Sequence, residues 1–188
     1  HLSLRRQRQM CIRDRHYSLD GSNLPSVTTI LSATKSEEDK AAILAWKQRV
    51  GTVEAERIKK EASARGSSMH SYIEQFLYGK LNQELLEDNN KSKKMAEEII
   101  DNGLKNKLLE IWGSEATIYY PGKYAGTADC IGVYEGKESI LDFKQSNKPK
   151  KVEYIEDYFL QIGAYSLAHN TVYNLSLIHI SEPTRPLY

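Results

Sequence analysis

Two strand-like stretches joined by a short glycine turn place the strongest constraint on the fold. In "YAGTADCIGVYE" (124–135) and "ESILDFK" (138–144), β-branched and aromatic residues are frequent. Gly136 and Lys137 between them fit a two-residue hairpin turn with glycine first. A further strand is predicted for "EATIYY" (115–120). Because helical patterns precede and follow these antiparallel strands, the sequence predicts an α/β domain with a central sheet.

The segment before these strands is predicted to be mainly helical. Residues 23–34 are β-branched and flanked by turns, which predicts an extended segment or a short strand. Ser36 then opens a capping-box pattern with acidic residues in the first turn, and Gly51 marks the expected end of this helix. Helical spacing resumes over 52–80, where a bend near Gly66 is expected.

Helical patterns also flank the strands on either side. Residues 81–95 are polar and are predicted to form a loop that runs into a helix. The amphipathic segment 93–112 continues this helix, and Asn102-Gly103 is the point at which an interruption is expected. After a loop over 147–151, residues 152–170 return to a helical period.

The two ends of the chain do not resemble protein-coding sequence. "RQRQMCIRDR" (6–15) is a translation of the transposon adapter used to prepare sequencing libraries. "LSLIHISEPTRP" (175–186) translates the reverse complement of that adapter and its flanking primer. We therefore expect residues 1–15 and 175–188 to be non-native adapter read-through, and 16–174 to be one domain truncated at its C-terminus.

Setting these ends aside changes the charge argument. The whole chain has 26 basic and 25 acidic residues, whereas 16–174 has 20 and 23, so its net charge is −3 instead of +1. The arginines within 5–15 are therefore no evidence for a nucleic-acid-binding arm. Cys130 is the single cysteine of 16–174, which excludes a disulfide framework or thiolate metal cluster within that segment. The sequence shows no apolar run of membrane-spanning length, and we expect no membrane partner.

The hairpin is expected to bring three charged residues together. If residues 136–137 form the loop, Asp129 lies opposite Lys144 across the two strands. Side chains alternate between the faces of a strand, so Asp142 shares this face with Lys144. Two aspartates this close repel each other unless a cation neutralises them, and carboxylate oxygens suit Mg²⁺ or Mn²⁺.

The same alternation points Leu141 and Phe143 to the opposite face of the sheet. It also leaves a simpler alternative open, in which Asp142 and Lys144 merely form the solvent-facing side of an edge strand. A one-residue slip in register would separate the charged residues, so the alternatives depend on the pairing of the hairpin.

Several motifs in a fixed order resemble a known family. "GTAD" (126–129), "DFK" (142–144) and "QIGAY" (161–165) resemble the PD-(D/E)XK nuclease superfamily, specifically its RecB-like exonuclease branch. "LPSVTTILSAT", "LAWKQRVG" and "ARGSSMHSYIE" resemble mitochondrial genome maintenance exonucleases and related phage and bacterial proteins, and the similarity covers nearly all of 24–170. The resemblance implies a restriction-endonuclease-like fold, with a central mixed sheet, an antiparallel hairpin core and flanking helices.

The resemblance also implies roles for individual residues. The implied ligands of Mg²⁺ or Mn²⁺ are His70, Asp129, Asp142 and the backbone carbonyl of Phe143. Lys144 matches the catalytic lysine that acts with the two aspartates. Gln161 and Tyr165 match a Gln-x-x-x-Tyr motif, and their i, i+4 spacing puts them on one helix face. In the family, that face adjoins the active site.

Each implied role has a simpler alternative. His70 is a lone helical histidine, which is commonly a core or surface residue, and Gln161 and Tyr165 could sit at a core boundary. Glu74, one turn after His70, is either a hydrogen-bond partner of the imidazole or part of a solvated face. The register of "SEATIYY" is not decisive, so whether Glu115 faces the site stays open.

The implied function is metal-dependent hydrolysis of phosphodiester bonds by a DNA exonuclease. The resemblance implies a preference for single-stranded DNA, a role in replication, repair or recombination, and a place in the cytoplasm of a bacterial or phage-infected cell. The alternatives are a CRISPR-associated or recombination-type nuclease of the same superfamily, and a non-catalytic DNA-binding domain. DNA contacts are expected from local basic and aromatic residues, namely Lys47, Arg49, Tyr124, Lys148, Lys150 and Lys151.

Overall fold

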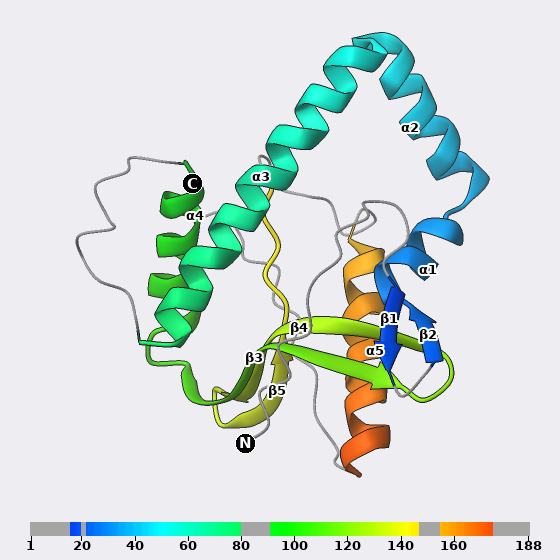
Figure 1. Cartoon of the computed structure of the whole chain (residues 1–188). Coiled ribbons are helices and arrows are strands. Elements are labelled where there is room, and N and C mark those ends of the chain that lie inside the picture. The colour runs from blue at the N-terminus through cyan, green and yellow to red at the C-terminus, as the bar shows by residue number, and fades with distance from the viewer. Residues whose placement is uncertain (1–15, 20–21, 80–90, 147–154, 175–188) are drawn as a thin grey trace.

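The structure is a computed structural model that describes residues 16–19, 22–79, 91–146 and 155–174 (Figure 1). Three groups of expectations therefore lie outside the described residues. They are the ends expected to be adapter read-through, the part of the expected loop over 81–90, and the expected basic loop that contains Lys148, Lys150 and Lys151.

A three-stranded antiparallel sheet lies between two layers of helices (Figure 1). Its order is β3–β4–β5, with bounds Leu108–Tyr120, Tyr124–Tyr134 and Lys137–Leu141. One face packs against α3 (Thr52–Leu77) and α4 (Lys91–Ile99). The other face packs against α1 (Val27–Ala33) and α5 (Glu156–Tyr173). The expected α/β domain with a central sheet is confirmed.

Each helical layer forms its own apolar core with the sheet. On the α3 side, the buried strand and helix residues include Met69, Ile73, Ile99, Cys130 and Leu141. On the α5 side, they include Val27, Ile118, Ile131, Ile140 and Ile162. Because adjacent residues of β5, Ile140 and Leu141, enter different cores, the C-terminal end of β5 is buried on both faces.

The expectation of an extended segment over 23–34 is wrong for most of its length. A hairpin of β1 (His16–Leu19) and β2 (Ser22–Pro25) ends there, and α1 follows directly. Ser26 caps α1 by accepting a hydrogen bond from the Thr29 backbone N–H at 3.0 Å. This cap and the burial of Val27 against the sheet outweigh the β preference of the threonines that follow.

Helix α2 (Glu37–Val50) begins and ends where the sequence predicts. The Ser36 hydroxyl caps it by accepting from the Asp39 N–H, and Gly51 ends it with a φ of +87°. No residue of α2 is buried, and in Figure 1 this helix and the start of α3 project away from the sheet. Helix α3 runs through Gly66 as one continuous helix.

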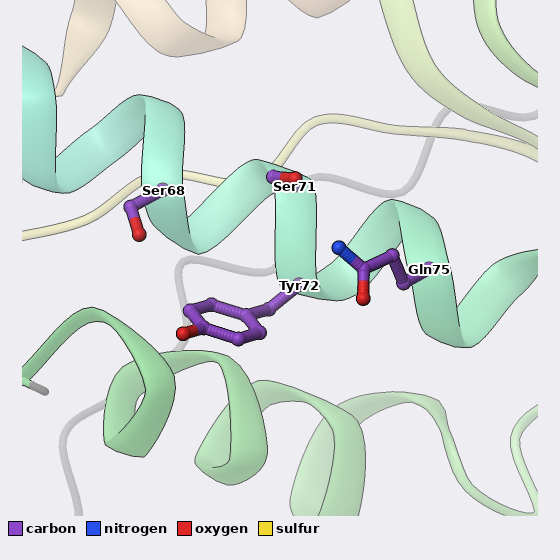
Figure 2. A pocket seen from close by; sticks show the side chains of 4 residues that line it. All are labelled: Ser68, Ser71, Tyr72 and Gln75. Carbon is purple, nitrogen blue, oxygen red and sulfur yellow. The ribbon is translucent and has the colours of Figure 1, made fainter. Parts of the chain in front are cut away.

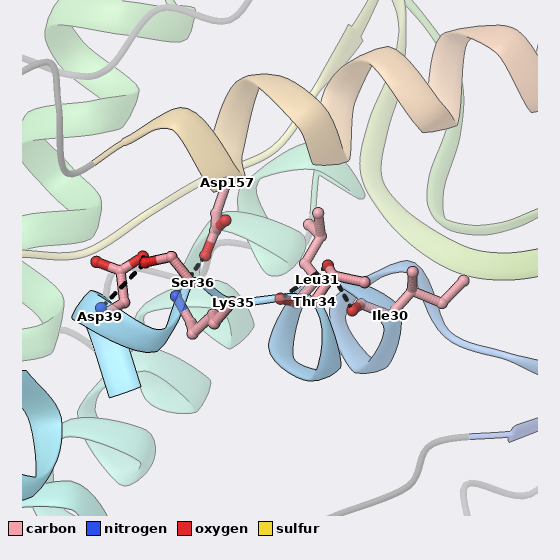
Figure 3. A network of polar contacts seen from close by, with 7 residues as sticks. All are labelled: Ile30, Leu31, Thr34, Lys35, Ser36, Asp39 and Asp157. Carbon is pink, nitrogen blue, oxygen red and sulfur yellow. Dashed lines mark hydrogen bonds and ion pairs between the residues drawn. The ribbon is translucent and has the colours of Figure 1, made fainter. Parts of the chain in front are cut away.

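An ion pair ties the base of this projection to α5. Lys35, between α1 and α2, places Nζ 2.7 Å from Oδ2 of Asp157 in the first turn of α5 (Figure 3). Both side chains are partly exposed, so the pair contributes at most about 1 kcal/mol. The ion pair holds the α1–α2 connection next to the start of α5, although these segments are far apart in the sequence.

The predicted helix over 93–112 is interrupted where expected but does not resume. Helix α4 ends at Ile99, a single π-helical turn spans Ile100–Leu104, and β3 starts at Leu108. The segment that was predicted to be helical is therefore split, because its second part pairs with β4 across two register shifts. Tertiary pairing overrides the helical pattern there.

The predicted register of the hairpin is wrong by two residues. Tyr134 pairs with Lys137, so the two loop residues are Glu135 and Gly136, and both have the positive φ of a type I′ turn. The ladder ends at the pair Cys130–Leu141. A two-residue shift keeps every side chain on its predicted face, although it moves the partners along the strand.

The mixed sheet that the family resemblance implies is not seen among the described strands. Both neighbours of β4 are antiparallel to it, and the one parallel contact reported for the described residues is an isolated bridge between Ser26 and Ala125. Within the described ranges, no helix combines the length and apolar composition that crossing a bilayer requires.

Candidate functional site

Asp129 links β4 to the segment that follows β5. It comes directly before the last ladder pair, Cys130–Leu141, so it lies beside Asp142 rather than opposite Lys144 as predicted. Its side chain is nearly buried, and Oδ2 accepts a hydrogen bond of 2.5 Å from the Phe143 backbone N–H. The backbone pairing between β4 and β5 ends at Leu141, and this side-chain bond then holds the segment after β5 against β4.

His70 approaches Asp129 from helix α3. Its Nδ1 lies 3.2 Å from Asp129 Oδ1, and its ring contacts Phe143 edge-on with centroids 6.4 Å apart. The neighbouring Met69 and Ile73 are fully buried, which fixes the rotation of the helix. Burial alone favours the neutral imidazole, but the hydrogen bond and charge of Asp129 outweigh it, so the pKa of His70 is raised.

Glu115 is the third member of this group. Ser114 pairs with Cys130 and Ala116 with Ala128, so Glu115 lies across from Asp129 on β3. One ligand atom each from His70, Glu115 and Asp129 lies within 4.8 Å of the others. The sequence left the orientation of Glu115 open, and the structure places it in the site.

The backbone of Glu115 adopts a conformation that is uncommon for a residue with a side chain. Its φ is +50°, in the left-handed region, within the 13-residue strand β3. That conformation costs an ordinary residue about 1 kcal/mol or more, and such strain is concentrated at functional sites. No motif in the sequence signals it, because the local pattern is that of a regular strand.

Asp142 and Lys144 form an ion pair next to this group. Asp142 Oδ2 contacts the Lys144 ammonium, and Asp142 Oδ1 accepts a hydrogen bond of 3.1 Å from Gln161 Nε2. The Asp142 side chain is buried while that of Lys144 is one-third exposed. Burial raises the pKa of Asp142, although the Lys144 ammonium acts in the opposite direction. The Lys144 ammonium also lies 5.6 Å from the centroid of the Tyr158 ring on α5.

The two residues of the Gln-x-x-x-Tyr motif are buried on α5 and connected to Asp142. Gln161 Nε2 also donates to the Tyr165 hydroxyl at 3.0 Å, and burial raises the pKa of Tyr165. Tyr165 in turn lies against β4 at Gly126, where a Cβ atom would come within 2.3 Å of the ring. Gly126 is thus required for α5 to approach the sheet, since only glycine leaves room for the tyrosine.

The structure therefore gathers the sequence-predicted site residues at one end of the sheet. His70 contacts Asp129, and a second group of contacts joins Lys144, Asp142, Gln161 and Tyr165. The two groups meet at Phe143, which follows Asp142 in the chain and donates its N–H to Asp129. The geometric group of candidate ligands, however, contains Glu115 and not Asp142, whose carboxylate is engaged by Lys144 and Gln161. Phe143 contributes its N–H to the network.

The donors of this group fit a divalent cation. One imidazole nitrogen and two carboxylate oxygens are ligands that Mn²⁺ and related metals accept, and two carboxylates placed across a strand pair repel each other without one. Glu74, on the turn of α3 after His70, makes no hydrogen bond to the imidazole in the described part of the chain.

A shallow pocket lies on a different face of α3. Ser68, Ser71, Tyr72 and Gln75 line it, and in Figure 2 Tyr72 points toward the neighbouring α4. None of the site residues lines it. Its lining carries no charged side chain, so it has none of the donors that the metal group offers.

The residues expected to contact DNA differ in their surroundings. Arg49 is exposed at the end of α2, and Lys47 pairs with Glu56 at 3.9 Å. Tyr124 donates its hydroxyl to the Ala164 carbonyl at 3.1 Å, which holds α5 to β4. The hydroxyl of Tyr124 is thus used within the fold.

Comparison with known proteins shows similarity to one group of exonucleases. The mitochondrial genome maintenance exonuclease 1 of Xenopus tropicalis is 29% identical over 176 residues, covering 87% of this chain and 48% of that protein. The human protein of that name is 30% identical over 167 residues, covering 82% and 46%. No protein-family model matches the chain. The chain spans about half the length of the curated relatives it matches, and over that half it is similar to mitochondrial genome maintenance exonuclease 1.

Proposed function

We propose that this protein is a DNA exonuclease that hydrolyses phosphodiester bonds with Mg²⁺ or Mn²⁺ and prefers single-stranded DNA. One observation carries the proposal: a His–Glu–Asp donor group and the Asp142–Lys144 pair meet at the same end of the sheet. The names of the similar proteins, which describe exonucleases of mitochondrial genome maintenance, support the same reaction class.

In this proposal, His70, Glu115 and Asp129 hold the metal. Asp142 is a further proposed ligand, because the family resemblance implies that role and its buried carboxylate lies beside Asp129. The carbonyl of Phe143 is proposed on the family resemblance alone. A bound divalent metal supplies Lewis acidity to the scissile phosphate and to the attacking water.

Lys144 is the proposed catalytic residue. Its ammonium group is one-third exposed, so it can donate hydrogen bonds to a phosphoryl oxygen or to the attacking water while Asp142 holds its position. Gln161 orients Asp142 through one amide hydrogen, and its other contact fixes the amide against Tyr165. These residues place a positive charge where negative charge develops, which requires no covalent protein nucleophile.

DNA binding in this proposal depends on local cations rather than on net charge. The expected native segment carries a net charge of −3, and Lys47 and Arg49 lie on the projecting helix α2. We expect modest affinity for DNA and a strong loss of affinity as salt increases.

Linear and circular single-stranded DNA test the exonuclease assignment directly. In Mg²⁺ or Mn²⁺, the purified protein should degrade the linear strand and leave the circle intact. In EDTA, it should cleave neither DNA. Labels at the 5′ and 3′ ends report the direction of degradation. Nicking of the circle would identify an endonuclease, and binding without cleavage in every metal would identify a DNA-binding domain instead.

A further inference from the structure

Gln145, the residue after Lys144, connects this part of the chain to helix α3. Its Oε1 accepts a hydrogen bond of 3.0 Å from Arg65 Nε, and its Nε2 donates to the Ala62 backbone carbonyl at 3.2 Å. Arginine Nε can only donate and a carbonyl can only accept, so both ends of the amide are satisfied in a single orientation. The Gln145 stem passes below Gly66, where an added Cβ would lie 3.7 Å from Cγ.

These bonds hold the chain on the side opposite to Lys144. The Lys144 side chain extends toward Asp142 and the Tyr158 ring of α5, whereas the Gln145 side chain extends toward α3. Neighbouring side chains of an extended segment point in opposite directions, so the chain here is held between the two helices. Turning Gln145 away from α3 would rotate the backbone that carries Lys144.

The described contacts attach this segment to α3 at two points. Phe143 reaches His70 through the Asp129 carboxylate, and Gln145 reaches Ala62. Ala62 and His70 are eight residues apart, which is about 12 Å along a helix. A single attachment would let the segment pivot, but two attachments this far apart fix its direction relative to the helix that carries the histidine.

We propose that Gln145 is a positioning residue for Lys144, which it holds against Asp142 by anchoring the chain to Ala62 and Arg65. The proposal rests on the catalytic role proposed for Lys144. The glutamine of the "DFKQ" sequence therefore also has a proposed role in the site. It follows the lysine directly, and both the oxygen and the nitrogen of its amide are hydrogen-bonded to residues of α3.

The test compares Gln145→Met, which keeps the length of the side chain, with Gln75→Met as a matched control. Gln75 lines the pocket on the same helix α3, and none of the site residues lines that pocket in the described part of the chain. For each variant we would measure kcat and KM on end-labelled single-stranded DNA, the Kd and stoichiometry of Mn²⁺, and the thermal midpoint. Metal stoichiometry reports the folded fraction independently of activity.

Gln145→Met should lower kcat between about tenfold and a hundredfold, as misplacement of a reacting group by an ångström does. KM, Mn²⁺ affinity and stoichiometry should stay within twofold of wild type, because the three clustered donors His70, Glu115 and Asp129 lie on α3, β3 and β4 and not on the segment that Gln145 anchors. Gln75→Met should match wild type throughout. A kcat for Gln145→Met equal to that of the control would overturn the proposal, as would a loss that falls equally on metal stoichiometry.

Arg65→Met supplies an independent arm, because it removes one of the two anchors without touching Gln145. Its kcat should fall less than that of Gln145→Met, and the double variant should be no worse than Gln145→Met alone, since the residues act as one unit. If the decrease in kcat of the double variant equals the product of the two single decreases, the anchoring role is contradicted.

The proposed function and the role of Gln145 can fail separately. If wild type cleaves no DNA, the proposed function fails. If wild type cleaves through Lys144 and these variants do not differ from it, only the role of Gln145 fails.

Discussion

The imidazole of His70 lies 3.2 Å from the carboxylate of Asp129, and this contact joins helix α3 to strand β4 at the heart of the candidate site. The other oxygen of the same carboxylate accepts the Phe143 N–H, so one side chain aligns three elements. Because Asp129 raises the pKa of His70, a proton competes with metal for this histidine at a higher pH than usual.

Metal affinity should therefore depend on pH. Only the neutral imidazole binds metal, so below the raised pKa of His70 the affinity should fall by up to about tenfold for each pH unit. Titration calorimetry with Mn²⁺ at pH 6 and at pH 8 should show tighter binding at the higher pH, and His70→Ala should bind weakly with a flatter profile. Equal affinities across this range in wild type would show that His70 is not a ligand.

Replacing Glu115 with glycine should separate stability from metal binding. Glycine adopts the φ of +50° without strain, so Glu115→Gly should keep or raise the free energy of unfolding by up to about 1 kcal/mol, while Mn²⁺ affinity falls. Glu135→Gly is the matched control, since Glu135 has a φ of +47° in the hairpin turn away from the site. It should leave Mn²⁺ binding unchanged. Denaturant unfolding and calorimetry measure the two effects, and unchanged metal affinity in Glu115→Gly would remove Glu115 from the site.

The approach of α5 to the sheet can be tested with two alanine substitutions. Gly126→Ala places a methyl group against the buried Tyr165 ring and should destabilise the fold by about 1–3 kcal/mol and lower activity by displacing the Gln161–Tyr165 pair. Gly163→Ala on α5 has open space around the new methyl group, and a helical alanine should stabilise by up to about 1 kcal/mol. Thermal unfolding of both variants checks the contrast, and the account is wrong if both shifts have the same sign.

His169, on the last turns of α5, should make the fold sensitive to acid. It is buried, its Nδ1 has no hydrogen-bond partner among the described residues, and burial lowers its pKa below the ordinary 6.5. The unfolded chain then binds the proton more readily, so stability is fully present above pH 6.5 and is lost as pH falls through the lowered pKa.

His169→Phe keeps a ring against Tyr173, which stacks on His169 with centroids 4.6 Å apart, and removes the titrating group. We expect its thermal midpoint to equal or exceed that of wild type at pH 7, since no unpaired nitrogen remains buried. Between pH 7 and 5 its midpoint should fall less than that of wild type. Parallel losses in the two proteins would show that His169 carries no share of the acid sensitivity.

The site was more predictable from the sequence than the elements that carry it. Asp129 lies on β4 as predicted, whereas Asp142 and Lys144 follow the end of β5 at Leu141. Side chains alternate along an extended chain, so the two-residue error in register did not change which of these residues share a side. The turn was misplaced because both Glu135-Gly136 and Gly136-Lys137 satisfy a two-residue turn. The choice between them is made by pairing of the whole ladder, which local sequence does not contain.

The remaining errors share one physical cause. In each case the local sequence is compatible with more than one backbone conformation, and tertiary contacts select the one that forms. The first residues of β3 have helical spacing in the sequence, yet they pair with β4 across two register shifts. Residues 27–33 include β-branched side chains, yet they form a capped helix. Glu115 could not be assigned because its orientation comes from a left-handed φ that no residue type in the segment requires. Only the pairing of its neighbours with β4 reveals that it faces Asp129.

Release of nucleotides from end-labelled linear single-stranded DNA by wild type and Lys144→Ala tests the central claim most directly. With Mg²⁺ or Mn²⁺ in excess, wild type should degrade the strand. Lys144→Ala should be slower by at least about a hundredfold while it binds Mn²⁺ with similar stoichiometry, because Lys144 lies next to the donor group but outside it. Wild-type rates in Lys144→Ala would contradict the assignment of this site as the place where the phosphodiester bond is cut.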